Sequence, residues 1–189
     1  MIASNPLLGP QWEPLGHVFV HLIERIRPGH HFHVQSYGRK FNLSPDTSPY
    51  LQAIRIDEGR LQMEVSGNLM VVPPLTELQH QELEFYGWTR PNPEPDEFAA
   101  DDEANPNFVR YFEANVDPLE ISEFILTTLV GVYGITEDDF WGFEGSADRV
   151  ASLKKLGRLK PTPGNDSAVI FAMPGKHLEM LESENASTK

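Results

Sequence analysis

The sequence has no cysteine among its 189 residues, and this absence removes three classes of chemistry. Disulfide bonds, cysteine-ligated zinc or iron–sulfur centres and thiol catalysis all need a cysteine side chain. Positive charge is also scarce, because 15 Lys and Arg stand against 28 Asp and Glu and the formal net charge at pH 7 is −13. A nucleic-acid-binding surface needs clustered positive charge, so we expect no nucleic-acid partner.

Long hydrophobic runs are missing too. The longest mostly apolar stretch, Phe124 to Ile135, is far shorter than the roughly 20 residues that a membrane-spanning helix needs. The first ten residues have neither the basic start nor the apolar stretch of a secretory signal. We therefore expect no membrane insertion and a cytoplasmic location.

Enzyme motifs are also lacking. The sequence has no glycine-rich phosphate loop and no Gly-x-Ser-x-Gly turn, so we expect no enzyme, no catalytic residue and no cofactor. His17 and His21 are one helical turn apart, a spacing that can bind a metal ion. However, these two residues, and likewise His31 and His33, fall on faces opposite the apolar ones, and no third ligand accompanies them. We expect no metal site.

The pattern of apolar residues predicts the first half of the fold. A helix is expected at 14–27, ended by Pro28 and Gly29, because its apolar residues follow helical spacing. Alternation predicts a strand at 31–37, with Phe32 and Val34 on one face and Gln35 with the histidines on the other. Two further strands at 50–56 and 61–65 form an antiparallel hairpin, and residues 69–72 extend it or form another strand.

The second half alternates helix, strand and helix. Pro73 and Pro74 are expected to open a helix that runs to about Tyr86 and ends at Gly87. An acidic, proline-rich loop over 89–107 is expected to be mobile, because it cannot bury enough apolar surface to offset the entropy lost on ordering. A strand at 108–112 and an apolar central helix from Asp117 to about Tyr133 follow. The expected core residues of the two helices are Leu75, Leu78, Leu83, Phe85, Leu119, Ile121, Phe124, Ile125, Leu129 and Val132.

The chain is expected to divide into a lead-in (1–13), an α+β domain (14–145) and a C-terminal extension (146–189). The extension is expected to hold a basic helix near 147–157, a linker at Pro161–Ser167, an apolar run at 168–173 and a polar tail. Residues 1–150 hold 9 basic and 24 acidic side chains, whereas residues 151–189 hold 6 and 4. This asymmetry suggests that the basic helix docks on the acidic domain and covers part of a binding surface; the alternative is a flexible tail.

Several local signatures coincide along this order of elements. Tyr50-Leu51 opens a strand, a Leu-rich helix ends in Gly87-Trp88 before Pro91, and Asn107-Phe108 follows the acidic loop. The long helix then ends in Gly134-Ile135. Over about residues 14–136 the chain resembles the type III secretion chaperone-like family of actinobacterial YbjN-related proteins, often called TY-Chap. It differs in having Tyr86 where the family often has Leu, and in its C-terminal extension.

The resemblance implies an antiparallel sheet packed by helices that binds extended polypeptide on a surface of sheet and helices, commonly as a homodimer. The family has no established enzymatic activity. We therefore expect a non-catalytic, chaperone-like protein that binds a protein or an extended polypeptide segment. The alternative is a regulatory or structural interaction module with one fixed partner. The chain is also rich in aromatic residues, which either fill the core or line a groove; the partner-binding candidates among them are Trp88, Phe108, Tyr111 and Trp141.

Overall fold

The computed structural model describes residues 8–38, 48–56, 59–67, 73–91, 107–145, 159–162 and 165–171. A short 3-10 helix leads directly into the first α-helix, and strands and helices follow in the order given next. The elements are η1 (Pro10–Trp12), α1 (Glu13–Arg25), β1 (His31–Gly38), β2 (Tyr50–Arg55), β3 (Leu61–Val65), α2 (Glu77–Phe85), β4 (Phe108–Phe112), α3 (Pro118–Gly131), β5 (Phe140–Gly145), β6 (Leu159–Thr162) and β7 (Asn165–Phe171).

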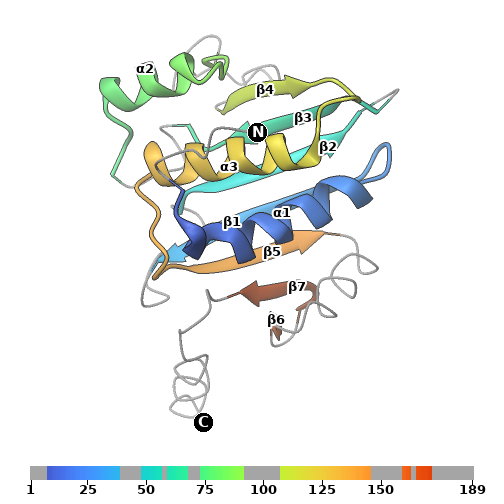
Figure 1. Ribbon diagram of the computed structural model, residues 1–189. Coiled ribbons are helices and arrows are strands. Elements are labelled where there is room, and N and C mark those ends of the chain that lie inside the picture. Colours follow the sequence, from blue (N-terminus) through green and yellow to red (C-terminus); the bar gives the residue numbers. More distant parts are fainter. Residues whose placement is uncertain are drawn as a thin grey trace, which may run out of the picture.

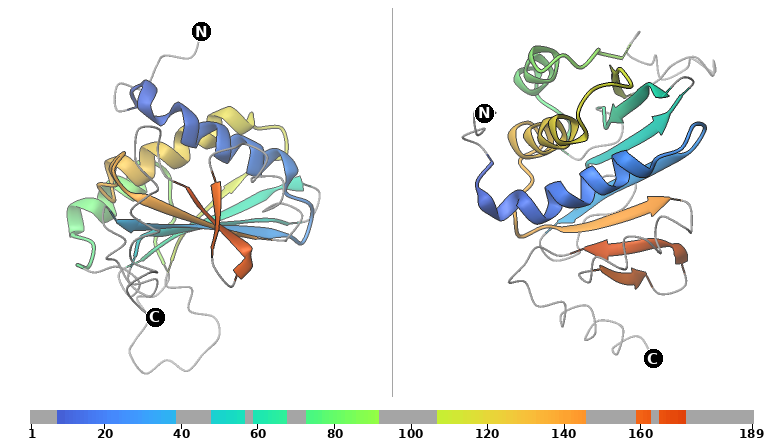
Figure 2. Two further views of the ribbon diagram at one scale, coloured as in Figure 1. Left: turned by 90° about the horizontal axis from the view of Figure 1, so that it is seen from below. Right: turned by 45° about the vertical axis from the view of Figure 1, so that its right-hand side comes forward.

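The strands form one antiparallel sheet in the order β4-β3-β2-β1-β5-β7-β6. Helices α1 and α3 lie against each other on one face of this sheet (Figures 1 and 2). The expected α+β class, an antiparallel sheet packed by helices, is therefore confirmed. The predicted hairpin is also confirmed, since β2 and β3 pair from Leu51 with Val65 to Arg55 with Leu61.

The core lies between the helices and the sheet. Successive strand residues point to opposite faces, so Phe32 and Val34 are buried under the helices while His31 is exposed, as the alternation predicts. Gln35 is an exception: it is only 6% exposed, because it lies in a central strand opposite Tyr50. The largest side chains that are almost completely buried are Trp141, Phe19, Phe32, Phe108 and Phe143.

Helix α3 begins as the sequence predicts. The Asp117 carboxylate accepts a hydrogen bond from the Leu119 N–H at 2.9 Å, and Pro118 occupies the first helical position. The helix ends at Gly131, slightly before the predicted end, and Gly134 follows with a φ of +65°. Leu119 is 42% exposed, so its assignment to the core is wrong. It lies in the first turn of the helix and lines an open pocket between the beginnings of α1 and α3.

Helix α2 begins later than the sequence predicts. Its first residue is Glu77 rather than the Pro73-Pro74 pair, because Thr76 caps it. The Gln79 N–H donates to Thr76 Oγ1 at 3.3 Å, and the Thr76 N–H donates to Gln79 Oε1 at 2.9 Å. This reciprocal capping box satisfies donors that the helix leaves unpaired at its start. The pattern Thr-x-x-Gln at 76–79 marks this start in the sequence, whereas the proline pair lies before the helix.

The end of α2 is confirmed at Gly87, which has a φ of +87°. Two backbone bonds close the helix there: Trp88 N–H to Leu83 O at 3.0 Å and Gly87 N–H to Glu84 O at 2.9 Å. This is the Schellman arrangement, in which a glycine adopts the left-handed conformation and the next residue packs back on the helix. Leu83 and Trp88 are accordingly both buried. The chain therefore leaves α2 in a fixed direction.

The C-terminal part of the chain differs most from the prediction. The aromatic segment at 140–145 is the strand β5 in the middle of the sheet. The linker predicted at Pro161–Ser167 is wrong, because β6 and β7 occupy both of its ends and β7 pairs with β5. The predictions for 69–72, the loop from 92 to 106, the basic helix and the polar tail lie outside the described residues. The division into domains stays a prediction.

A single arginine ties the end of α1 to the β2–β3 hairpin. Arg55 donates from Nε to Ile26 O at 3.0 Å and from Nη2 to Ile23 O at 3.1 Å. Its Nη1 donates to the carbonyl of Gly59 in the hairpin turn. Carbonyl groups in the last turn of a helix have no partner within the helix, and a cation at that end also complements the helix dipole. Burial lowers the pKa of Arg55, but an arginine remains charged in a protein.

We expect Arg55→Ala to lower the free energy of unfolding by about 2–4 kcal/mol, since charge-assisted bonds to carbonyls are lost and those carbonyls stay partly buried. Arg55→Lys should recover only part of this, because an ammonium group cannot span three carbonyls. Arg27→Ala, at an exposed position close by, should change stability by less than about 0.5 kcal/mol. Urea unfolding followed by tryptophan fluorescence measures all three. Equal stability of Arg55→Ala and Arg27→Ala would contradict this account.

Candidate functional site

Strand β4 forms one edge of the sheet. It pairs with β3 on its inner side, from Val65 opposite Phe108 to Leu61 opposite Phe112. On its outer side, among the residues that the structure describes, Thr89 pairs with Val109: the Thr89 N–H donates to Val109 O at 2.8 Å and the Val109 N–H donates to Thr89 O at 3.0 Å. One residue of the segment after α2 thus already occupies part of this edge.

Tyr111 continues the outer edge beyond this bridge. Backbone groups of alternate strand residues point to the same side. The N–H and C=O of Tyr111 therefore point outward like those of Val109, and no bridge between described residues covers them. The Tyr111 side chain is 56% exposed, whereas Phe108 and Phe112 are buried on the helix-covered face. Backbone hydrogen-bonding groups and an exposed aromatic ring thus lie at one position.

A polar network on the face away from α1 and α3 holds the start of β4. Asn107 donates from Nδ2 to Glu64 Oε2 at 3.1 Å, and its Oδ1 accepts from the Tyr50 hydroxyl at 2.9 Å. The same carboxylate of Glu64 accepts from Gln52 Nε2 and Gln62 Nε2, both at 2.9 Å. Asn107 is 6% exposed, so these bonds satisfy groups that water reaches poorly. The network holds Asn107, the residue just before β4, against β3 and β2.

Arg110 holds β4 from the other face. Its guanidinium lies over the ring of Phe124 in α3, with Cζ 4.4 Å from the centroid, and over Phe112 at 5.1 Å. Nη1 donates to the carbonyl of Tyr86, the residue that caps the end of α2. A side chain at Gly87 would overlap this guanidinium, so the glycine is needed for space as well as for its backbone conformation. Arg110 therefore joins β4, α3 and the end of α2.

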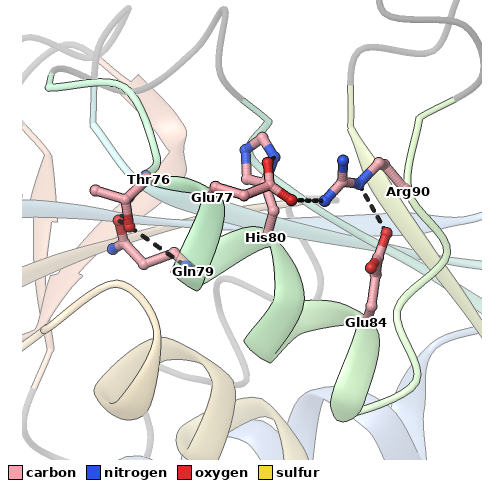
Figure 3. A network of polar contacts seen from close by, with 6 residues as sticks. All are labelled: Thr76, Glu77, Gln79, His80, Glu84 and Arg90. Carbon is pink, nitrogen blue, oxygen red and sulfur yellow. Dashed lines mark hydrogen bonds and ion pairs between the residues drawn. The ribbon is translucent and has the colours of Figure 1, made fainter.

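A second arginine ties the segment with Thr89 to α2, as Figure 3 shows. Arg90 donates from Nη2 to Glu77 Oε1 at 2.9 Å, and its Nε lies 2.7 Å from Glu84 Oε1. The two carboxylates are seven residues apart and therefore lie on one side of the helix. The hydrogen bond from Arg90 lowers the pKa of Glu77. Arg90 thus keeps its neighbour Thr89 beside β4.

The structure separates the four aromatic residues that the sequence singled out. Tyr111 is exposed, but Trp88, Phe108 and Trp141 are 1–2% exposed and belong to the core. Trp88 donates from Nε1 to Thr128 Oγ1 at 3.1 Å, and Phe108 packs under β4 against His80. Trp141 lies on β5, with three strands between it and β4. Contact of these residues with a partner remains a prediction.

Two exposed apolar residues were assigned wrongly to the core. Leu78 and Phe85 of α2 are 65% and 87% exposed. They are seven residues apart, so they lie on the same side of the helix, while Leu83 faces the core. The helix lies at the margin of the fold and buries only a narrow stripe. The weak apolar periodicity of this segment was the available signal.

His17, His21 and His33 belong to α1 and β1 rather than to the β4 edge. His17 Nε2 is 3.9 Å from Glu13 Oε1 at the surface, and His21 Nδ1 is 2.8 Å from Arg25 Nη1. Burial and then the charge of Arg25 lower the pKa of His21. The His33 ring packs on Tyr50 with centroids 5.0 Å apart, and burial lowers its pKa. Within the described ranges, no three His, Asp or Glu side chains group so as to hold a metal ion.

We expect Arg90→Ala to leave global stability within about 1 kcal/mol, because exposed ion pairs contribute little. It should nevertheless speed hydrogen exchange of the Val109 amide by roughly threefold to tenfold, since the Thr89 bridge opens more often. Arg90→Lys keeps one ion pair and should fall between the wild type and Arg90→Ala. Native-state exchange measured by NMR tests this, and an unchanged Val109 rate in Arg90→Ala would show that the bridge does not depend on Arg90.

Comparisons with known proteins identify a family for this chain. No helix in the described part of the chain is both long and apolar enough to span a bilayer. No curated protein and no solved structure matches the sequence. A family described as "T3SS (YopN, CesT) and YbjN peptide-binding chaperone 3" matches residues 7–147, a range that contains every element from η1 to β5. The chain therefore belongs to this TY-Chap3 family of peptide-binding chaperones, which confirms the resemblance seen in its sequence.

Proposed function

We propose that the protein binds extended polypeptide segments without catalysing a reaction, and that a bound segment adds to the outer edge of β4. The observation that carries the proposal is the edge position of Tyr111, where outward backbone groups and an exposed ring coincide. Strand addition takes affinity from main-chain hydrogen bonds, which every sequence offers, and specificity from neighbouring side chains. Membership of a peptide-binding chaperone family supports the binding of polypeptide.

The described residues at this edge suggest separate roles in binding. Tyr111 contacts the segment directly, through its backbone and its ring. Trp88 and Phe108 support the edge from inside, since both are buried beneath or beside β4. The exposed Phe85 lies near the end of α2, next to the carbonyl that Arg110 holds, and offers a further apolar contact. In this proposal Trp141 has no direct contact with the segment at the β4 edge.

The cytoplasmic location expected from the sequence and the homodimer implied by the resemblance belong to the same proposal. The alternative, an interaction module with one fixed partner, predicts a different outcome in the cell. A chaperone binds many unfolded segments weakly, whereas a fixed module co-purifies with one folded partner in equal amounts. Quantitative mass spectrometry of the proteins that co-purify from native extract distinguishes these two cases. Sedimentation of the purified protein measures whether it is a dimer.

We expect Tyr111→Pro to weaken binding of a reduced, carboxymethylated and fluorescently labelled unfolded polypeptide by roughly tenfold. The substitution removes one outward N–H and the ring, each worth about 0.7 kcal/mol, but no bond to β3. Tyr111→Val keeps the N–H and should weaken binding by only about threefold. Fluorescence anisotropy titrations give the dissociation constants.

The difference between the two substitutions isolates the backbone contribution at this position. Thermal unfolding provides the control, since both variants should remain folded with similar midpoints. If Tyr111→Pro is folded and binds the unfolded polypeptide as tightly as the wild type, the edge of β4 is not the binding site. If both variants lose the same affinity, the ring rather than the backbone carries the contact.

A further inference from the structure

A pocket of about 380 Å³ lies between the beginning of α1 and the beginning of α3. None of the described residues that line it belongs to β4 or α2, so it is separate from the edge discussed above. Its floor is apolar, with Trp12 and Leu126 only 5% and 4% exposed. Leu119, at 42% exposure, lies at its lip. When a partner covers apolar surface that is open to water, the free energy of the system falls.

The pocket is preformed because α1 and α3 are fixed to each other at its floor. Ser122 Oγ donates to the carbonyl of Gly16 at 2.9 Å, which joins the two helices directly. Gly16 carries no side chain, and a Cβ there would lie 3.5 Å from both Leu126 Cδ1 and Ser122 Oγ. The helices thus approach closely while the space beside them stays open. A rigid pocket loses little conformational entropy when it is filled.

The rim of the pocket is acidic. Glu13 and Glu123 line it, and no Lys or Arg is among its described lining residues. His17 lies 3.9 Å from the Glu13 carboxylate and adds positive charge only when it is protonated. The chain as a whole carries a net charge of −13, so the wider field has the same sign. A second copy of this chain would bring a like-charged rim against this one, which charge repulsion opposes.

We propose that this pocket binds an apolar side chain of a polypeptide segment that carries Lys or Arg beside it. The volume of about 380 Å³ lies within the range of about 300–1,000 Å³ seen for ligand sites, so the pocket has room for an apolar anchoring side chain. An apolar anchor in a desolvated pocket with charge pairs at its rim is a common form of interface hot spot. The inference rests on the proposed function only in taking the ligand to be a polypeptide.

The test uses two labelled peptides of identical length. Both have a central Leu-Phe pair in a Gly/Ser background; one has lysines on either side of the pair and the other has glutamates. Binding to the full-length protein is followed by backbone amide NMR shifts and by anisotropy at low and at physiological salt. We expect the lysine peptide to shift the amides of Gly16, Leu119 and Glu123, and to bind at least about fivefold more tightly than the glutamate peptide. Higher salt should reduce that difference.

Charge-neutral variants test the rim without changing its shape. Glu13→Gln combined with Glu123→Gln should weaken binding of the lysine peptide by about fivefold, because two exposed ion pairs are lost. The matched control is Glu24→Gln combined with Glu137→Gln, which removes the same charge at exposed positions outside the pocket. The control should bind the lysine peptide within about twofold of the wild type, since charges beyond a Debye length are screened.

Several results would overturn the inference. One is equal affinity for the two peptides, another is an equal loss in the rim variant and its control, and a third is no binding at all. A dimer that buries the pocket would make a second copy its occupant. Amide shifts confined to Val109 and Tyr111 would refute the pocket while leaving the β4 proposal in place. Shifts confined to the pocket, with Tyr111→Pro binding unfolded polypeptide normally, would do the reverse.

Discussion

The carbonyl groups at the C-terminal ends of α1, α2 and α3 need donors, and side chains from other elements supply them. Arg55 in β2 donates to the last turn of α1, Arg110 in β4 donates to Tyr86 at the end of α2, and Gln79 in α2 donates to Val132 O at the end of α3, at 2.6 Å. A helix cannot satisfy these carbonyls itself. Each such bond therefore fixes the angle and the position of a helix relative to an element distant in the sequence.

These bonds explain how a marginal helix comes to lie at a sheet edge. Helix α2 buries little apolar surface, so packing alone would hold it weakly. Gln79 links α2 to α3, and Arg110 links Tyr86 at the end of α2 to β4. Arg90 links α2 to the segment that holds Thr89. Thr89 is consequently held beside Val109, and this single bridge is where the segment pairs with β4. Among the described residues, none pairs with the remainder of the β4 edge at Tyr111.

Short-range patterns in the sequence were enough for much of this fold. Apolar spacing found α1, the β2–β3 hairpin and β4, and Asp117 with Pro118 marked the start of α3. These features depend on neighbours within a few residues. The resemblance also identified the family correctly. Strand β5 was missed because its aromatic residues lie among glycines and acids, and its role depends on pairing with β1 and β7.

The candidate site depended more on tertiary contacts. An aromatic residue looks the same in the sequence whether it fills a core or faces a partner. Of the four chosen residues, only Tyr111 is exposed, because position along β4 decides which face a side chain takes. Leu78 and Phe85 are exposed because α2 lies at the margin of the fold, and the weak apolar periodicity of the segment was the one sign of this in the sequence. The outward backbone groups of β4 follow from the order of strands, which no local pattern encodes.

The most direct test of strand addition is hydrogen exchange at two neighbouring amides of β4. The Val109 N–H is already bonded to Thr89, whereas the Tyr111 N–H faces outward beyond that bridge. With saturating unfolded, carboxymethylated polypeptide, our account predicts that exchange of the Tyr111 amide slows strongly while that of Val109 changes little. Unchanged exchange at Tyr111 in a protein that has demonstrably bound the polypeptide would contradict the account.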